Sequence, residues 1–312
     1  MKKLLLASAF ALSAFATQYP LEYENCGVAE TLDKKPTRAV VNDINMIDMA
    51  VALGIEAQLA GVSGINNKFQ KDDIPALKNV PELSLKYPPL EVLLDAKTDL
   101  YVAGWSYGMK VGGDVTPDIL RPHGIKTFIL RESCVRVDPA VPAADIDRLL
   151  YADILKLGKL FDKEQKAQEL VDGWKKELAS TLSKIKNPKP IKVMLFDSPG
   201  EKGLIAAKHA MPSAIIAAVG AKNVMDDMEG SWVRSSYEDL ATRQAEFYIV
   251  VEYKPDSYKK TIEFLEEHPL MSQTPGVKNK RYLPLRYAEI TPGPKNIEAA
   301  LKLAKALYPE DF

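Results

Sequence analysis

The sequence predicts an α/β protein of two Rossmann-like lobes, each with a central, largely parallel sheet, joined by a long backbone helix. Continuous apolar runs alternate with helical patterns on both sides of residues 162–186, which indicates parallel strands covered on both faces. Residues 162–186 carry one apolar stripe at helical spacing, made of Ala167, Leu170, Val171, Trp174, Leu178, Leu182 and Ile185. At ~1.5 Å per residue this helix would extend roughly 36 Å, about the width of a small domain. We expect it to connect the lobes and to begin with Asp162 and Gln165 as a capping box.

The same alternation divides the chain into four segments. Residues 17–145 and 188–312 each hold strand and helix patterns, which predicts one α/β lobe in each range. Residues 146–187 hold two helical patterns that would link the lobes. Residues 1–16 resemble a cleavable signal peptide, with two lysines, an apolar run too short to span a bilayer, and Ala14-Phe15-Ala16 as the cleavage site. We therefore expect an exported protein that begins near Thr17.

The charge balance excludes several classes of partner. Without Lys2 and Lys3, 39 basic residues face 42 acidic ones, so the mature chain is mildly acidic. No large basic field remains to attract nucleic acid or anionic lipid. The sequence has no glycine-rich phosphate-binding motif and, after the signal, no second long apolar run. We expect a soluble product that does not use nucleotides.

The two cysteines, Cys26 and Cys134, are 108 positions apart, and the chain has no C-x-x-C motif that would indicate redox catalysis. In an exported chain they most simply form one disulfide that closes a long loop. Two buried free thiols are the alternative. Lipidation of Cys26 is not expected, because Tyr23-Glu24-Asn25 lack the small and aliphatic residues that such a site needs.

Candidate ligand-binding residues follow the predicted strands, since ligands of open α/β sheets bind beyond the carboxyl ends of the strands. The segments concerned are 42–43, 63–66, 104–108 and 131–133 in the first lobe, and 197–201, 208–211, 252–254 and 286–287 in the second, with Trp232 in a further loop. Their aromatic side chains can stack on planar groups, and their arginines can pair with oxyanions. This combination suits a bulky, partly planar, anionic ligand. For any one of these residues, an ordinary loop role is the alternative.

The segment Gly104-Trp105-Ser106-Tyr107-Gly108 has the G-x-S-x-G pattern of the hydrolase nucleophile elbow, which makes a secreted serine hydrolase with Ser106 as nucleophile the rival hypothesis. An elbow needs a helix directly after its serine, but residues 109–114 form a glycine-containing loop and the next helix start is Thr116-Pro117. The only late histidine, His268, stands in a helix-end context. We therefore favour a loop whose Trp105 and Tyr107 face a cleft.

A dedicated metal site has little support, because His123, His209 and His268 share no ligand spacing. His209 differs from the other two, since it precedes a predicted helix together with Lys208. It could ligate an iron centre axially. A hydrogen-bonding or structural role is the favoured alternative.

Several short sequence segments occur in an order that is typical of one protein family. They are Arg38-Ala39-Val40-Val41 with Ala52-Leu53-Gly54, Leu157-Gly158-Lys159-Leu160-Phe161, Val219-Gly220-Ala221, Gly230-Ser231-Trp232 with Tyr237-Glu238-Asp239-Leu240, and Pro292-Gly293-Pro294. Together with the signal, the two lobes and the joining helix, they resemble the helical-backbone (class III) periplasmic binding proteins that serve ABC importers of iron-siderophores, haem and cobalamin. The resemblance covers nearly the whole mature chain. Glu24-Asn25-Cys26-Gly27 and Glu132-Ser133-Cys134 look like the iron-siderophore branch of that family.

The resemblance implies a monomeric periplasmic receptor without catalytic residues or a cofactor of its own. It would capture a metal chelate, in first place a ferric siderophore, between its lobes and deliver it to an inner-membrane ABC permease. Surface carboxylates on each lobe would dock onto that permease. The resemblance also supports the Cys26–Cys134 disulfide and implies little closure on binding, because a helix resists bending. A haem or cobalamin receptor is the alternative within the family.

On this hypothesis eight residues form the expected ligand site. Trp105, Tyr107, Trp232 and Tyr253 would supply apolar or stacking walls, while Arg131, Lys208 and Arg286 would offset ligand charge. His209 completes the set through its loop position. A haem ligand would predict an axial residue, with His209, Tyr107 or Tyr253 as candidates, and cobalamin would need fewer cations.

Overall fold

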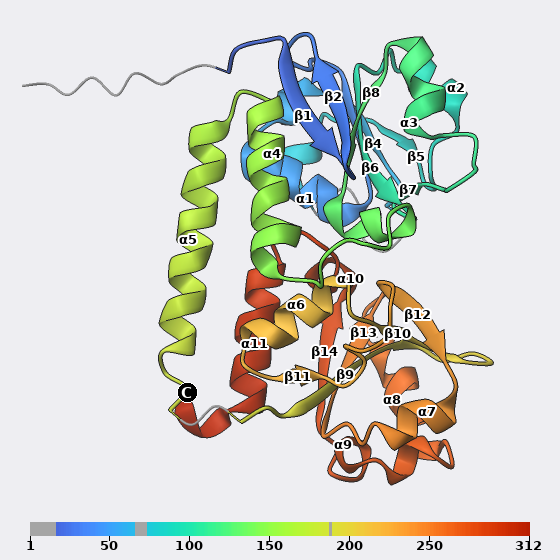
Figure 1. Ribbon diagram of the computed structural model, residues 1–312, viewed down its shortest axis with the longest axis vertical. Coiled ribbons are helices and arrows are strands. Elements are labelled where there is room, and N and C mark those ends of the chain that lie inside the picture. The colour runs from blue at the N-terminus through green and yellow to red at the C-terminus, as the bar shows by residue number, and fades with distance from the viewer. Residues whose placement is uncertain (1–16, 66–73, 187–188) are drawn as a thin grey trace, which may run out of the picture.

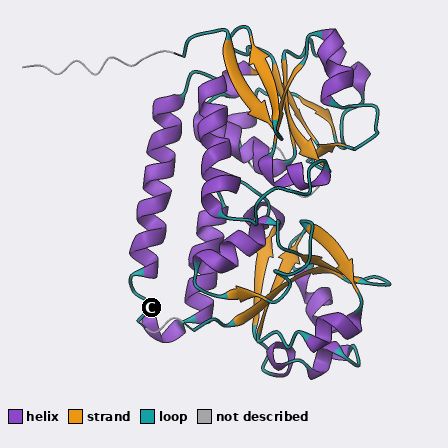
Figure 2. Ribbon diagram, viewed as in Figure 1, coloured by secondary structure: helices purple, strands orange, loops and turns teal. Residues whose placement is uncertain are grey.

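The computed structural model describes residues 17–65, 74–186 and 189–312. The expected signal peptide, Asn66 of the predicted segment 63–66, and residues 187–188 at the junction of the predicted linking segment and second lobe lie outside these ranges. In the described part, two α/β lobes are stacked along the long axis of the molecule and one long helix runs beside both (Figure 1). The predicted fold class is confirmed, and Figure 2 shows a sheet with helices packed around it in each lobe.

The first lobe is built on a parallel sheet with the strand order β5-β4-β3-β6-β8. Its strands and helices are β3 (Ala39–Asn42), α1 (Ile44–Leu53), β4 (Leu59–Ser63), β5 (Glu82–Ser84), α2 (Leu90–Asp95), β6 (Leu100–Trp105), β7 (Gly108–Met109), α3 (Pro117–Leu120) and β8 (Lys126–Ile129). Every residue of β3 and β6 is buried. Both faces of these strands are therefore covered, which explains why their sequences are continuously apolar.

The second lobe has a mixed sheet, ordered β12-β10-β9-β13-β14 with β11 beside β9. Its elements are β9 (Lys192–Ser198), β10 (Gly203–Ala206), α6 (Met211–Ala218), β11 (Lys222–Asn223), β12 (Trp232–Ser235), α7 (Tyr237–Thr242), β13 (Phe247–Glu252), α8 (Tyr258–Glu267), α9 (Pro275–Lys278), β14 (Tyr282–Arg286), α10 (Tyr287–Ile290) and α11 (Asn296–Leu307). The pairs of β9 with β13 and of β13 with β14 are parallel, as predicted. The antiparallel pairs of β10 with β9 and β12 were not predicted, because residues 203–206 and 232–235 are short and lie between turn residues.

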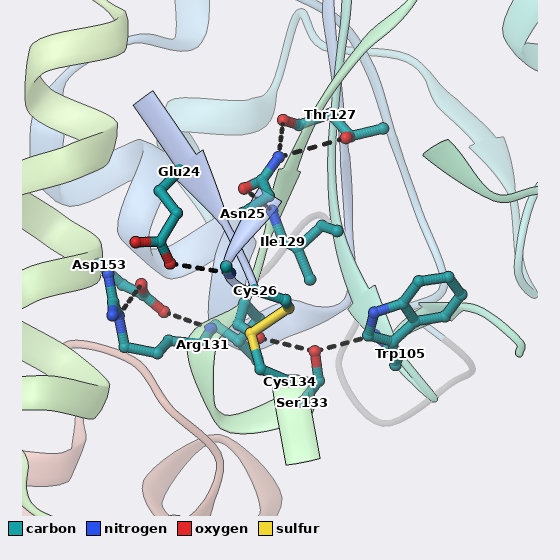
Figure 3. Close-up of a disulfide and its surroundings, with 12 residues drawn as sticks. Glu24, Asn25, Cys26, Trp105, Thr127, Ile129, Arg131, Ser133, Cys134 and Asp153 are labelled. Carbon is teal, nitrogen blue, oxygen red and sulfur yellow. Dashed lines mark hydrogen bonds and ion pairs between the residues drawn. A yellow bond between two sulfur atoms is a disulfide. The ribbon is translucent and has the colours of Figure 1, made fainter. Parts of the chain in front are cut away.

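A hairpin of β1 (Leu21–Asn25) and β2 (Val28–Leu32) precedes the first sheet, and it too was not predicted. Tyr23 and Asn25 of this hairpin donate hydrogen bonds to the Thr127 carbonyl of β8 at 2.7 and 2.6 Å. Cys26, in the turn that follows β1, forms the disulfide with Cys134 (Figure 3). The predicted pairing is confirmed, and it ties the hairpin to the short helical segment Arg131–Arg136.

The predicted joining helix is α5 (Glu164–Leu182), preceded by the π-helical segment Asp147–Tyr151 and α4 (Ala152–Leu160). Its predicted apolar stripe faces the protein, since Ala167 and Val171 are fully buried and the other stripe residues pack on the core. The predicted capping box is wrong. Asp162 has a left-handed backbone (φ 57°) and its carboxylate accepts from the Thr17 amide at 2.8 Å, so the helix starts after Lys163 without a side-chain cap.

The lobes also contact each other directly, through α1 and the segment that precedes α11. The Asn45 side-chain amide of α1 donates to the Pro292 carbonyl at 2.8 Å, and a Cβ added at Gly293 would meet the Asn45 carbonyl at 3.0 Å. On the next turn of α1, Asp48 pairs with Lys295 at 2.8 Å. Backbone this close leaves little room for one lobe to move against the other at this point.

The approach of α4 to α5 generates a stability prediction. A Cβ added at Gly158 of α4 would lie 2.4 Å from the Ala167 Cβ of α5, whereas one added at Gly173 of α5 would meet nothing within 4 Å. We expect Gly158→Ala to lower the free energy of unfolding by about 2 kcal/mol, because the two helices must separate. Gly173→Ala, the matched control, should raise it by about 1 kcal/mol through helix propensity. Urea denaturation measures both, and a stabilising Gly158→Ala would contradict the observed helix spacing.

Candidate functional site

A small cavity of about 180 Å³ lies between the two lobes. Its walls are mainly aromatic, with two charged side chains, and the residues that carry the argument are Tyr107, Arg136, Asp197, Trp232, Tyr253 and Tyr287. Ser106 and Leu204 complete the walls with residues of the segment Ile290–Thr291. Both lobes therefore contribute to the same cavity.

The ends of strands position these side chains. Tyr107 lies in the turn between β6 and β7, where its amide donates to the Gly104 carbonyl at 2.9 Å. In the second lobe, Tyr253 follows β13 directly and Tyr287 follows β14 directly. This is the edge at which ligands of parallel sheets bind.

Each tyrosine of the cavity donates its hydroxyl hydrogen to a carboxylate: Tyr253 to Asp197 at 2.6 Å, Tyr287 to Asp43 at 3.0 Å, and Tyr107 to Glu132 at 3.1 Å. These three bonds fix the rings in place, and a bond to an ionised carboxylate is stronger than a neutral one. Burial, followed by the charge of the paired carboxylate, raises the pKa of all three phenols above the usual value of 10.0. The three phenols are therefore neutral hydrogen-bond donors at physiological pH.

Two hydrogen bonds cross from lobe to lobe at this cavity. The Trp232 indole Nε1 of the second lobe donates to the Tyr107 hydroxyl at 2.9 Å, and Tyr287 reaches Asp43 of the first lobe. The Asp43 carboxylate also accepts from the Ile44 amide at 2.8 Å, which caps α1. Tyr253 and Tyr287 lie ring against ring with their centroids 5.6 Å apart. The aromatic walls thus consist of two interacting pairs, Trp232 with Tyr107 and Tyr253 with Tyr287, in one cavity.

Glu132 lies behind Tyr107 and is 1% exposed. Desolvation raises the pKa of its carboxyl to about 7, against the smaller lowering effects of the Tyr107 hydroxyl and the Arg136 charge. The Glu132 carboxyl therefore titrates near neutral pH. Its charge acts on the Tyr107 hydroxyl, which donates to Glu132 and accepts the hydrogen bond from the Trp232 indole.

Of the eight residues expected at the site, the structure brings three together: Tyr107, Trp232 and Tyr253 all line the interlobe cavity. Trp105 is 9% exposed and packs with Tyr101 and Ala103 on the other face of the first sheet. Its backbone amide donates to the Ser133 hydroxyl at 2.9 Å (Figure 3). The alternation of a strand explains the difference, because residues at even spacing from Tyr101 share its face.

The three expected cations do not line the cavity and each lies beside a carboxylate. Arg131 pairs with the buried Asp153 at 3.7 Å (Figure 3), Lys208 with Glu229 at 2.5 Å, and Arg286 with Glu252 at 3.8 Å. Their charges are partly compensated within the protein. A direct role in binding stays a prediction for all three.

His209 is 1% exposed, and both of its ring nitrogens are engaged. Nδ1 lies 3.0 Å from the Pro142 carbonyl and Nε2 lies 2.9 Å from the Glu229 carboxylate. This geometry suits the hydrogen-bonding role. Within residues 17–65, 74–186 and 189–312, no group of three or more His, Cys, Asp or Glu side chains is placed to hold a metal ion.

Ser106 has a left-handed backbone (φ 68°) and is followed by β7, which pairs in parallel with the end of β6. A nucleophile elbow requires a helix at this point. The structure therefore gives the hydrolase hypothesis no support, and Ser106 is a turn residue at the cavity wall.

Sequence reasoning missed Arg136 as a site residue. It stands at the end of the helical segment after β8, and among the described residues no carboxylate lies within 4 Å of its guanidinium. Its position three residues beyond the predicted binding segment 131–133 was the available signal. Asp43, Asp197 and Tyr287 lie inside predicted binding segments. Nothing in the sequence showed that Tyr287 pairs with Asp43 or that Tyr253 pairs with Asp197.

Glu132 yields a pH prediction. Its pKa in the folded protein, about 7, lies above the ordinary value of 4.5, so the unfolded chain releases this proton first as pH rises. This carboxyl therefore lowers stability progressively between these values, by about 3 kcal/mol in total. Glu132→Gln lacks the effect and should gain that amount relative to wild type when urea denaturation is compared at pH 4.5 and about pH 8. The exposed Glu177→Gln controls for net charge, and parallel profiles for wild type and Glu132→Gln would contradict the assignment.

Comparison with known proteins agrees with this geometry. The sequence profile of the periplasmic binding protein family matches residues 40–285. A relative from Bacillus subtilis (strain 168), the uncharacterized ABC transporter substrate-binding lipoprotein YvrC, is 24% identical over 293 residues, which cover 90% of this chain and 83% of that protein. No described helix is both long and apolar enough to cross a membrane.

Two solved structures share the fold. One is an ABC-type Fe³⁺-hydroxamate transport protein from Saccharomonospora viridis, with a TM-score of 0.78, 20% identity, and coverage of 93% of this chain and 99% of that chain. The other is the periplasmic haem-binding protein HutB of Vibrio cholerae, with a TM-score of 0.68, 20% identity, and coverage of 88% and 99%. Proteins of the matched family bind small molecules for transport and are not enzymes. The two-lobed fold, the interlobe cavity and the profile match together show that this chain belongs to the periplasmic binding protein family.

Proposed function

We propose that this protein is the periplasmic receptor of an ABC importer for a metal chelate, specifically a ferric siderophore. The observation that carries the proposal is the aromatic interlobe cavity, in which three phenols are fixed by carboxylates and Arg136 supplies a cation without a carboxylate beside it among the described residues. Planar, oxygen-rich iron ligands fit such walls, because aromatic faces stack and a guanidinium pairs with oxyanions.

The same proposal implies that the receptor delivers the chelate to the permease. The receptor would meet its chelate after export through the expected signal peptide and release it when its two lobes dock onto an inner-membrane permease. Iron is here the cargo rather than a resident cofactor. Preorganised walls favour binding, because little entropy is lost in ordering them.

Tryptophan fluorescence can test the ligand class. Trp232 is the tryptophan of the interlobe cavity, whereas Trp174 lies on α5 and Trp105 on the far face of the first sheet. We expect ferric complexes of hexadentate tris(catecholamide) or tris(hydroxamate) chelators to quench the fluorescence with a Kd in or below the micromolar range, and Trp232→Phe to remove most of the quenching. Arg136→Gln should weaken binding of the anionic tris(catecholamide) complex about tenfold through loss of a charge-assisted hydrogen bond, and Arg136→Lys less.

Haemin and cyanocobalamin belong in the same assay. Saturable binding of haemin with a Soret shift, or of cyanocobalamin, without binding of either ferric complex would replace the siderophore by that ligand. Absence of quenching by every chelate would contradict the proposed function as a whole.

A further inference from the structure

A second and larger cavity opens on the first lobe beside the interlobe cavity. Its volume is about 610 Å³, and its lining includes Lys86, Tyr87, Gly108, Lys110 and Asp114. The Tyr87 hydroxyl donates a short hydrogen bond to the carbonyl of Ser106, which lines the interlobe cavity. The two cavities therefore meet at the contact of Tyr87 with Ser106.

Electrostatics links the same two regions. Burial raises the pKa of Tyr87 to about 12, and the charges of Asp43 and Arg136 act on the same phenol. Arg136 lines the interlobe cavity, and Asp43 accepts the hydrogen bond of Tyr287. The Tyr87 hydroxyl thus lies within electrostatic range of two first-lobe residues at the interlobe cavity, Arg136 and the Asp43 that holds Tyr287.

Size indicates that a chelate needs both spaces. Pockets for drug-sized ligands hold about 300–1,000 Å³. The interlobe cavity, at about 180 Å³, falls below this range, and the second cavity, at about 610 Å³, lies within it. A chelate held by the aromatic walls would therefore extend past Tyr87 into the second cavity.

The second cavity is lined by two cations without a carboxylate within 4 Å among the described residues, unlike the three cations of the predicted site. Lys86 and Lys110 are exposed, and among the described residues neither ammonium lies within 4 Å of a carboxylate. Arg131, Lys208 and Arg286 each have such a partner. Asp114 is the acidic residue of the lining, so two positive charges stand against one negative charge.

We infer that the two cavities form one ligand site, in which Lys86 and Lys110 bind an anionic part of the chelate. The inference rests on the proposed function and narrows it to a class. Chelates with peripheral or net negative charge, such as tris(catecholate) or carboxylate-bearing complexes, are the preferred ligands, and neutral tris(hydroxamate) complexes bind more weakly.

The test compares two ferric probes on two double variants. The probes are a hexadentate tris(catecholamide) complex, a trianion, and a neutral hexadentate tris(hydroxamate) complex. Lys86→Gln/Lys110→Gln should weaken binding of the trianion about tenfold, since two exposed charge pairings are lost together, and change binding of the neutral complex less than about twofold. The control, Lys278→Gln/Lys305→Gln on the second lobe, makes the same charge change at exposed positions away from both cavities and should leave both affinities unchanged.

Salt provides an independent readout. Added salt should weaken binding of the trianion by wild type, and this dependence should be smaller in Lys86→Gln/Lys110→Gln. Equal losses for both probes, or equal losses in the two double variants, would overturn the inference while leaving the proposed function intact. If neither probe binds the wild-type protein, the proposed function fails and the inference with it.

Discussion

The packing of the second lobe onto α1 and α5 is the constraint on which the rest of the structure depends. Val171 and its neighbours on α5 bury one stripe against a core shared by both lobes, and the Asn45 amide holds the Pro292 carbonyl behind the cavity. A helix resists a sharp bend, because a kink disrupts its backbone hydrogen bonds, so a joint of this kind restrains the distance between the sheets. The cavity in front of it then has walls that are set before a ligand arrives.

The interlobe site follows from that fixed spacing. Because the carboxyl ends of both sheets open onto the same gap, turn residues such as Tyr107 and strand-end residues such as Tyr253 come together from distant parts of the chain. Carboxylates then determine how they are held, as the bond from Tyr287 to Asp43 illustrates across the two lobes. In the same arrangement, no carboxylate of the described residues lies within 4 Å of the charged groups of Arg136, Lys86 and Lys110. The positive charge that is available to a ligand is therefore concentrated on the first lobe.

The sequence was sufficient for the parts of the structure that depend on periodicity. The stripe through Ala167 and Val171 predicted the joining helix, and apolar runs predicted the parallel strands, because burial of both faces leaves a direct mark on composition. The β9–β10–β12 arrangement left no such mark, since β12 is only partly buried and the direction in which short strands pair is not encoded in periodicity. Site residues were harder still. Arg131 has Asp153 beside it, whereas among the described residues no carboxylate lies within 4 Å of Arg136. Such partners come from distant positions that spacing does not reveal.

The central claim is that the joint keeps the two lobes at nearly the same separation with and without a ligand. Spin labels on exposed positions of the two lobes, Glu91→Cys on α2 and Lys260→Cys on α8, allow double electron–electron resonance to measure that separation directly, because both native cysteines are in the disulfide. Saturating ferric chelate should shift the distance maximum by less than about 2 Å. A shift of several ångströms, or a broad distribution that narrows when the chelate binds, would contradict this claim.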